Sequence, residues 1–239
     1  MSTARSGRGT AVAAAWADAY VAQDDWLATQ VRGGIAPCGV KLATLPDGDG
    51  PVTVTGWLTS EMQLKNSACL PAALRASSIE VEVAARLGAG GVPTTRQDAI
   101  GMIASLHVAF EFVATSPTLA EIGAQQLVAR NVNALAFLVA VPGLGAEQGL
   151  RELTSSDVRV TAPGGPLGWA GGTPPDVVAA VMEAGGSLAR RGHRLQPGWW
   201  ILTGRIGAKL DPAEVTGLTA HLGRFESVTA KWDTSRSGT

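Results

Sequence analysis

Three glutamates inside strand-like apolar runs are the strongest constraint on how this chain can fold. Glu80 and Glu82 lie in the run IEVEVA, and Glu111 interrupts the run VAFEFV. Successive side chains of a strand alternate between its two faces, so Glu80 and Glu82 point to the same side. A carboxylate among apolar neighbours is costly unless it is paired or coordinated. We therefore expect the two runs to lie side by side, with the three carboxylates converging.

Converging carboxylates are typical of a site for a hard divalent cation. Mg²⁺ and Mn²⁺ prefer oxygen ligands and leave coordination positions open for water and substrate. The pattern also has a simpler interpretation, because a glutamate pair of this spacing is common on a solvated sheet face. Glu111 is equally compatible with an edge strand. From these residues alone both interpretations stay open.

The bulk properties of the sequence restrict the class of protein. Its 239 residues suffice for one large domain, or for a domain with a small appendage. With 46% hydrophobic and 16% charged residues the chain is globular, and a net charge of −1 gives no reason to expect nucleic acid or a membrane surface as a partner. Two cysteines provide no disulfide framework, so we expect a reduced, cytoplasmic setting. No apolar run is long enough to span a membrane.

Hydrophobic periodicity predicts more strands than helices, in irregular alternation. Helices are expected over residues 11–32, 94–106 and 174–191. Strands are expected over residues 39–43, 52–64, 78–87, 108–113, 135–141, 158–161, 199–203, 215–221 and 226–232. Residues 46–51 and 163–175 are rich in glycine and proline and indicate a turn and a loop. This order favours an α+β fold with a mixed sheet over a doubly wound parallel one.

Several short motifs occur in a recognisable order between residues 16 and 233. They are Asp18-Ala19-Tyr20 with Gln23, Gly39-Val40-Lys41-Leu42, Gly56-Trp57-Leu58-Thr59 with Met62, Ile79–Ala84, Phe110-Glu111-Phe112, Val128-Ala129-Arg130-Asn131 and the segment Gly192–Gly204. Each motif is weak alone, but the ordered set resembles the fumarylacetoacetate hydrolase superfamily. Within it, the set is most similar to the branch of 2-oxopent-4-enoate hydratases and 4-oxalocrotonate decarboxylases.

The resemblance implies a fold and a set of site residues. The fold would be a mixed β-sheet roll of the C-terminal-domain type of that superfamily, with a short helical segment over residues 11–38 and a catalytic domain over residues 39–233. It implies Mg²⁺ or Mn²⁺ as the cofactor and a small 2-oxo acid as the substrate. In this interpretation Glu80, Glu82 and Glu111 hold the metal, Lys41 supplies charge or a proton, and the substrate-binding residues are Arg130, Asn131, Thr203 and Gly204.

The resemblance leads us to expect a metal-dependent lyase that hydrates a 2-oxo-4-enoate. One alternative is a decarboxylase of a 2-oxo-enedioate such as 4-oxalocrotonate, and another is a diverged, non-catalytic partner subunit of such an enzyme. Arg130 stands where this branch usually has an aspartate, and it would pair with the second carboxylate of a dioate. The superfamily also implies a homo-oligomer, with a paralogous lyase as a further associate. The lack of a histidine near the N-terminus argues against C–C bond hydrolysis.

Overall fold

The structure is a computed structural model that describes residues 4–47, 50–66, 69–167, 169, 171–213 and 215–232, with side chains from residue 16 onward except that of Asp47. Its α-helices are α1 (Ala4–Arg32), α2 (Arg96–Met102), α3 (Leu119–Ala129), α4 (Ala146–Leu153) and α5 (Val177–Arg190). Short 3₁₀ turns are η1 (Ser60–Met62), η2 (Ala72–Ala76) and η3 (Asn131–Asn133). Within these residues no helix is both long and apolar enough to cross a membrane.

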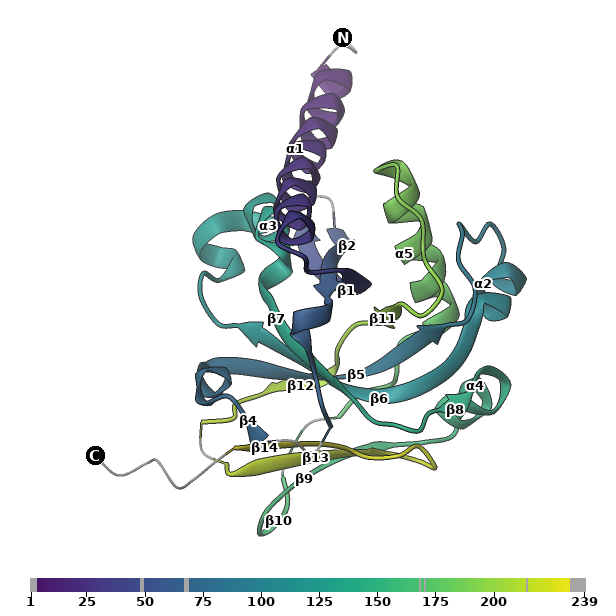
Figure 1. The fold of residues 1–239 in the computed structure, drawn as a ribbon. Helices are drawn as coiled ribbons and strands as arrows, with labels where there is room; N and C mark the ends of the chain where they lie inside the picture. Colours follow the sequence, from purple (N-terminus) through teal and green to yellow (C-terminus); the bar gives the residue numbers. More distant parts are fainter. Residues whose placement is uncertain are drawn as a thin grey trace.

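The strands form two sheets, which lie one above the other (Figure 1). The larger sheet has the order β2-β1-β11-β5-β6-β7-β3, with β12 added beside β5 and β8 beside β6. Its strands are β1 (Pro37–Asp47), β2 (Gly50–Thr59), β3 (Gln63–Leu64), β5 (Ser77–Leu87), β6 (Ile103–Ala114), β7 (Ala134–Val139), β8 (Leu144–Gly145), β11 (Trp200–Leu202) and β12 (Ile206–Leu210). The smaller sheet has the order β10-β9-β13-β14-β4. Its strands are β4 (Cys69–Leu70), β9 (Val158–Ala162), β10 (Gly165–Pro166), β13 (Gly217–Leu222) and β14 (Val228–Trp232).

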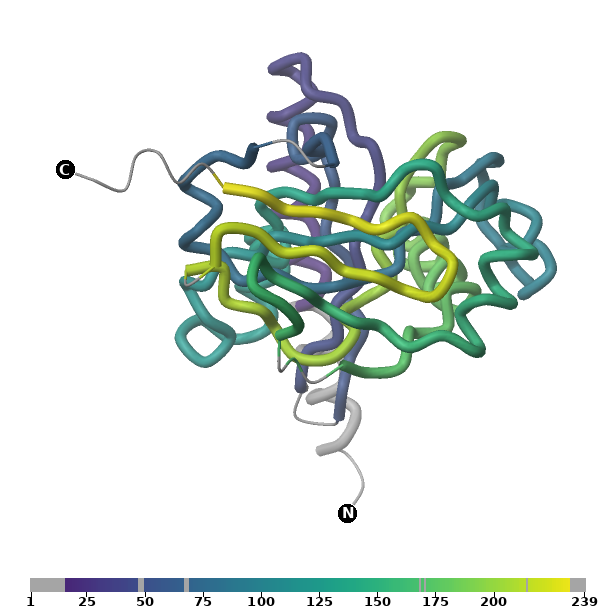
Figure 2. The backbone as a smooth tube through the Cα atoms, turned by 90° about the horizontal axis from the view of Figure 1, so that it is seen from below, coloured from purple at the N-terminus to yellow at the C-terminus, as the bar shows by residue number. Residues whose placement is uncertain are grey.

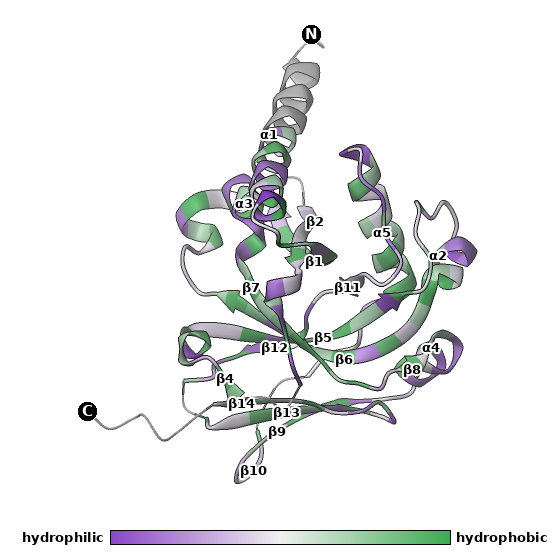
Figure 3. Ribbon diagram, viewed as in Figure 1, coloured by the Kyte–Doolittle hydropathy of each residue, from purple (hydrophilic) through white to green (hydrophobic). Residues whose placement is uncertain are grey.

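The larger sheet is a roll. Its outer strands β2 and β3 are joined by η1 alone, and both β2 and η1 contact β7, which neighbours β3. The smaller sheet covers the outside of this roll, and Figure 2 shows its long hairpin of β13 and β14 lying over the larger sheet, where it contacts β6 and β7. Apolar residues line the layer between the sheets, whereas the outward-facing parts of α4 are hydrophilic (Figure 3). The main core therefore lies between the sheets, and a second apolar cluster, which includes Ala84, Ala109 and Phe137, lines part of the inner face of the roll.

Alternation along β5 and β6 separates these two faces. On β5 the core face carries Ile79, Val81 and Val83, all fully buried against the smaller sheet. The residues between them point into the roll, as period-two geometry requires. Glu80 and Glu82 are among these inward-pointing residues. The strand pattern read from the sequence thus places the acids inside the roll.

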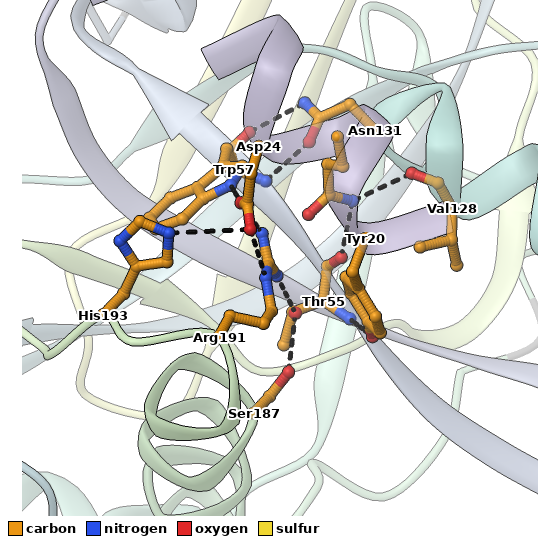
Figure 4. A network of polar contacts seen from close by, with 10 residues as sticks. Tyr20, Asp24, Thr55, Trp57, Val128, Asn131, Ser187, Arg191 and His193 are labelled. Atoms are coloured by element: carbon orange, nitrogen blue, oxygen red, sulfur yellow. Dashed lines mark hydrogen bonds and ion pairs between the residues drawn. The ribbon is translucent and has the colours of Figure 1, made fainter. Parts of the chain in front are cut away.

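A buried polar network fixes α1 against β2 and the end of α5 (Figure 4). Arg191 forms an ion pair with Asp24, and its guanidinium stacks 4.5 Å from the ring of Tyr20. Trp57 donates its indole hydrogen to Asp24 at 2.9 Å. Gln23 donates to the carbonyl oxygens of Thr55 and Val128, each at 2.9 Å. These contacts join four segments that are far apart in the sequence.

Most of the expected elements occur, with differences at several places. The strand expected over 52–64 is interrupted by η1, and the loop expected over 163–175 contains β10. The α+β class, the mixed-sheet roll and the N-terminal helix are confirmed, and α1 ends at Arg32 as expected. The helix expected over 94–106 is wrong beyond Met102, because Leu106 and Val108 follow the period of two that continues through β6. The sequence did not predict α4 or β12. The expected turn at 46–51 lies partly outside the described residues, and the division into 11–38 and 39–233 stays a prediction.

Candidate metal centre

The register of two long strands brings the three glutamates together. In the antiparallel pair of β5 and β6, Glu80 lies directly opposite Glu111, and Glu82 lies opposite Ala109. Cross-strand partners lie within about 5.5 Å, and residues two apart share a face. One carboxylate oxygen from each glutamate lies within 4.8 Å of the other two. The convergence expected from the sequence is therefore present in the structure.

Lys41 enters the same interior from β1. Its side chain is almost completely buried, with 1% exposed, and its Nζ lies 2.5 Å from Oε1 of Glu111. Two glycines make this placement possible. A Cβ on Gly39 would lie 2.0 Å from the carbonyl oxygen of Trp200, so only glycine allows β1 to pair this closely with β11. A Cβ on Gly56 would lie 3.1 Å from Cγ of Lys41 itself.

The segment between β1 and β5 passes beside the acids. β11 separates β1 from β5 and ends at Leu202, which pairs with Lys41 on one side and Ala84 on the other. Beyond it the chain stays beside β5: the Thr203 amide donates to the Val83 carbonyl oxygen at 3.1 Å, and the Gly204 amide donates to Oε2 of Glu82 at 2.9 Å. The regular pairing with β1 ends at Lys41, whose side chain meets Glu111.

The oxygen atoms of the site fit a divalent cation. Oε1 of Glu82 and Oε2 of Glu111 are buried and accept no hydrogen bond from any described residue. Buried carboxylate oxygens without donors are costly. Two ammonium groups lie nearby. Lys41 contacts Glu111, and Nζ of Lys209 lies 2.9 Å from Oε1 of Glu80. Three converging acids, two of them with unpaired buried oxygens, match the hard, oxygen-rich ligand set of Mg²⁺ or Mn²⁺.

Without a cation, burial favours the protonated form of two of the acids, Glu82 and Glu111. Burial, followed by the charges of Glu111 and Glu80, raises the pKa of Glu82 well above its ordinary value. Burial also raises the pKa of Glu111 to about 7, with Glu80 adding to the effect and Lys41 opposing it. For Lys41, burial alone would lower the pKa, but the neighbouring carboxylates outweigh it and leave the pKa raised. Lys41 is therefore an ammonium donor at neutral pH.

A cavity of about 580 Å³ opens beside the acids. Lys41 and Glu80 form part of its wall, together with Thr203 and Gly204 from the loop after β11. A volume in this range suits a small organic ligand. Of the four residues that the resemblance assigned to substrate, the structure thus brings Thr203 and Gly204 to the cavity.

The other two assigned residues lie elsewhere. Arg130 is exposed at the C-terminal end of α3 and is not part of the cavity wall. Asn131 is buried, and both ends of its side-chain amide are used by Trp57: Oδ1 accepts from the Trp57 amide at 2.6 Å and Nδ2 donates to the Trp57 carbonyl at 2.9 Å. Asn131 thereby fastens η3 to β2. Its contacts are those of a structural residue, and the substrate role of both residues stays a prediction.

The cavity also contains cations that the sequence did not single out. Arg205 and Lys209 line it from the segment that follows Gly204. This segment has no clear alternation, so no strand is expected there from the sequence. The available signal in the sequence was weak: Arg205 and Lys209 lie within five residues of the proposed substrate-binding pair Thr203-Gly204.

The sequence has no match among protein-family models or curated proteins. Solved structures do match. 4-Oxalocrotonate decarboxylase from Pseudomonas putida G7, in complex with magnesium and adipate, aligns with a TM-score of 0.77 at 19% identity, over 91% of this chain and 86% of that one. The chain has the fumarylacetoacetate hydrolase fold.

Other solved structures agree on this fumarylacetoacetate hydrolase fold at lower similarity. Fumarylpyruvate hydrolase from Pseudomonas aeruginosa, in complex with Mn²⁺ and pyruvate, aligns with a TM-score of 0.56 at 13% identity, over 82% of this chain and 88% of that one. 2-Hydroxyhepta-2,4-diene-1,7-dioate isomerase from Mycobacterium marinum gives 0.58 at 15% identity, over 82% of this chain and 74% of that one. Identities this low establish a common fold, and the chemistry must be argued from the site.

Proposed function

We propose that this protein is a metal-dependent decarboxylase of a 2-oxo-enedioate such as 4-oxalocrotonate. The observation that carries the proposal is the convergence of Glu80, Glu82 and Glu111 beside the buried Lys41 at a cavity wall. Two solved structures of this fold support the ligand class. One is a decarboxylase holding magnesium and a dicarboxylate, and the other is a hydrolase holding Mn²⁺ and a 2-oxo acid.

In this proposal the three glutamates hold Mg²⁺ or Mn²⁺, which supplies a Lewis acid for the negative charge that develops on the substrate's keto oxygen. The chain's own contribution begins with orientation. The Gly204 amide holds Glu82, and Lys41 holds Glu111, so both carboxylates are fixed before substrate arrives. The buried walls of the roll keep bulk water away from these groups, which strengthens each electrostatic contact.

The reaction balances without a further reactant. The bond between the distal carboxyl group and its neighbouring carbon breaks, and carbon dioxide leaves. The electron pair of that bond shifts through the conjugated double bond onto the keto oxygen, giving a dienolate. The ammonium group of Lys41 lies at the cavity wall, where it can donate a proton to the product or stabilise its negative charge. The product is a 2-hydroxy-dienoate.

The sequence favoured hydration of a 2-oxo-4-enoate, with decarboxylation as the alternative. The structural similarity supports the alternative better, because the decarboxylase aligns over 91% of the chain. The hydratase stays the second candidate, since it would use the same acids and a related 2-oxo acid. A non-catalytic partner subunit is disfavoured, because a purely structural subunit has no need of three converging acids, two of them buried. Cytoplasmic location, self-association and association with a paralogous lyase stay predictions.

The test is an ultraviolet assay with purified protein, with and without Mg²⁺. We expect Mg²⁺-dependent loss of 2-oxo-hex-3-enedioate with release of carbon dioxide, and slower or no consumption of 2-hydroxypenta-2,4-dienoate. Lys41→Met should lower turnover on the order of 10²–10⁴-fold, with a normal circular dichroism spectrum. Preferential consumption of the dienoate would favour the hydratase. No Mg²⁺-dependent turnover of either substrate would reject both candidates.

A further inference from the structure

β12 is irregular where it passes the glutamates. Ile206 pairs with Val81 and Leu210 with Ile79, so four steps along β12 match two steps along β5. The extra residues form a bulge, a device that re-aims side chains beside functional sites. The bulge is tightly built: its Gly207 has a φ of 69°, and a Cβ on Gly172 would lie 2.9 Å from the Gly207 nitrogen.

The bulge determines which side chain faces Glu80. Regular pairing from Ile206 onward would place Gly207 across from Glu80, and the site would receive no side chain from β12. The two extra residues bring Lys209 there, and its Nζ lies 2.9 Å from Oε1 of Glu80. The lysine side chain is 45% exposed, whereas that of Glu80 is 12% exposed.

This ion pair differs from the one that Lys41 makes. Lys41 is almost completely buried beside Glu111. Lys209 is half-exposed and lies on the wall between the main cavity and a second hollow of about 370 Å³, which Asp211 also lines. Its ammonium group can therefore leave Glu80 for a neighbouring space that contains a carboxylate.

We propose that Lys209 is a tethered counter-ion that competes with the divalent cation for Glu80 and so lowers the metal affinity of the site. The proposal rests on the proposed function only in taking Glu80, Glu82 and Glu111 as the ligands. An ammonium group held at one ligand repels a dication at close range. Lys209 must swing toward Asp211 before Glu80 is free to bind. Metal would then be held loosely and exchange readily, so that occupancy follows the free metal concentration.

The test is calorimetric titration of the metal-free, full-length protein with Mn²⁺. Lys209→Met should bind Mn²⁺ roughly tenfold more tightly than the wild type, and the difference should shrink at high salt because the effect is electrostatic. Lys209→Arg keeps the charge and should match the wild type. Lys65→Met is the matched control, because Lys65 is exposed and is not part of the cavity wall. The Mn²⁺-induced rise in melting temperature should be larger in Lys209→Met than in the wild type.

The outcomes separate this inference from the proposed function. Equal or weaker Mn²⁺ binding by Lys209→Met, with normal binding by the wild type, would overturn the counter-ion role and leave the decarboxylase proposal standing. Wild-type protein that binds no Mn²⁺ would overturn both. If Lys209→Met does not fold, Lys209→Gln removes the same charge with a polar side chain and is judged by the same criteria.

Discussion

Glu82 and Glu111 are buried carboxyl groups whose ionisation the surrounding fold opposes. Both have a raised pKa, mainly because burial removes the water that would stabilise their charge. A raised pKa in the folded state means that the folded protein retains a proton that the unfolded chain releases. Keeping Glu82 and Glu111 ionised in the interior lowers the stability of the fold, and a bound cation would offset this loss.

This linkage predicts how stability depends on pH without metal. An unfolded glutamate titrates near its ordinary value of 4.5, whereas folded Glu111 titrates at about 7. The contribution of protonated Glu111 to folding stability is fully present below pH 4.5 and is lost as the pH rises through about 7. We expect the metal-free protein to lose stability between these two pH values. Comparison with a Glu111→Gln variant subtracts the contributions of other groups.

Added Mg²⁺ should reverse that loss, because cation binding favours the ionised carboxylates. The rise in melting temperature caused by millimolar Mg²⁺ should therefore be larger at pH 8 than at pH 5.5, which thermal denaturation at both pH values measures. A rise of the same size at both would show that Mg²⁺ binds elsewhere.

At the scale of the element, the attachment of α1 is the contact most open to a mutational test. Asp24 has 25% of its side chain exposed and Arg191 only 8%. Burial opposes the charge of Asp24, but hydrogen bonds from Arg191 and Trp57 hold its pKa below the ordinary value. Asp24→Asn leaves the Arg191 charge without its partner, which should lower the free energy of unfolding by about 2 kcal/mol.

Urea denaturation measures this effect against a matched control. Glu147→Gln breaks the ion pair with Arg151, in which both side chains are largely exposed, and should change stability by less than about 0.5 kcal/mol. Equal effects of the two substitutions would mean that the network in Figure 4 does not hold α1 in place.

The elements that the sequence predicted are those with an unbroken period. Around the glutamates β5 and β6 alternate, as Ile79-Glu80-Val81-Glu82-Val83 and Phe110-Glu111-Phe112, so the direction of Glu80, Glu82 and Glu111 follows from the sequence. β12 could not be found this way, because its bulge interrupts the alternation and its pairing depends on the close approach to Gly172. Lys209 was missed for the same reason.

For the whole molecule, the sequence predicted the convergence of the three acids better than the residues that line the cavity beside them. The acids and Lys41 carry their own signal, a charge inside an apolar strand. Residues that border the cavity depend on how distant segments turn, which no local pattern encodes. Arg130 was therefore placed at the substrate by its position in a motif, whereas the structure exposes it outside the cavity wall.

The most direct test of the account is to locate the metal by anomalous X-ray diffraction from crystals grown with Mn²⁺. The account predicts one strong anomalous peak among Glu80, Glu82 and Glu111, at about 2.0–2.3 Å from a carboxylate oxygen of each, which is the range of metal–oxygen bonds. It also predicts that Lys209 no longer contacts Glu80. Crystals that contain Mn²⁺ elsewhere but show no peak at these carboxylates would contradict it.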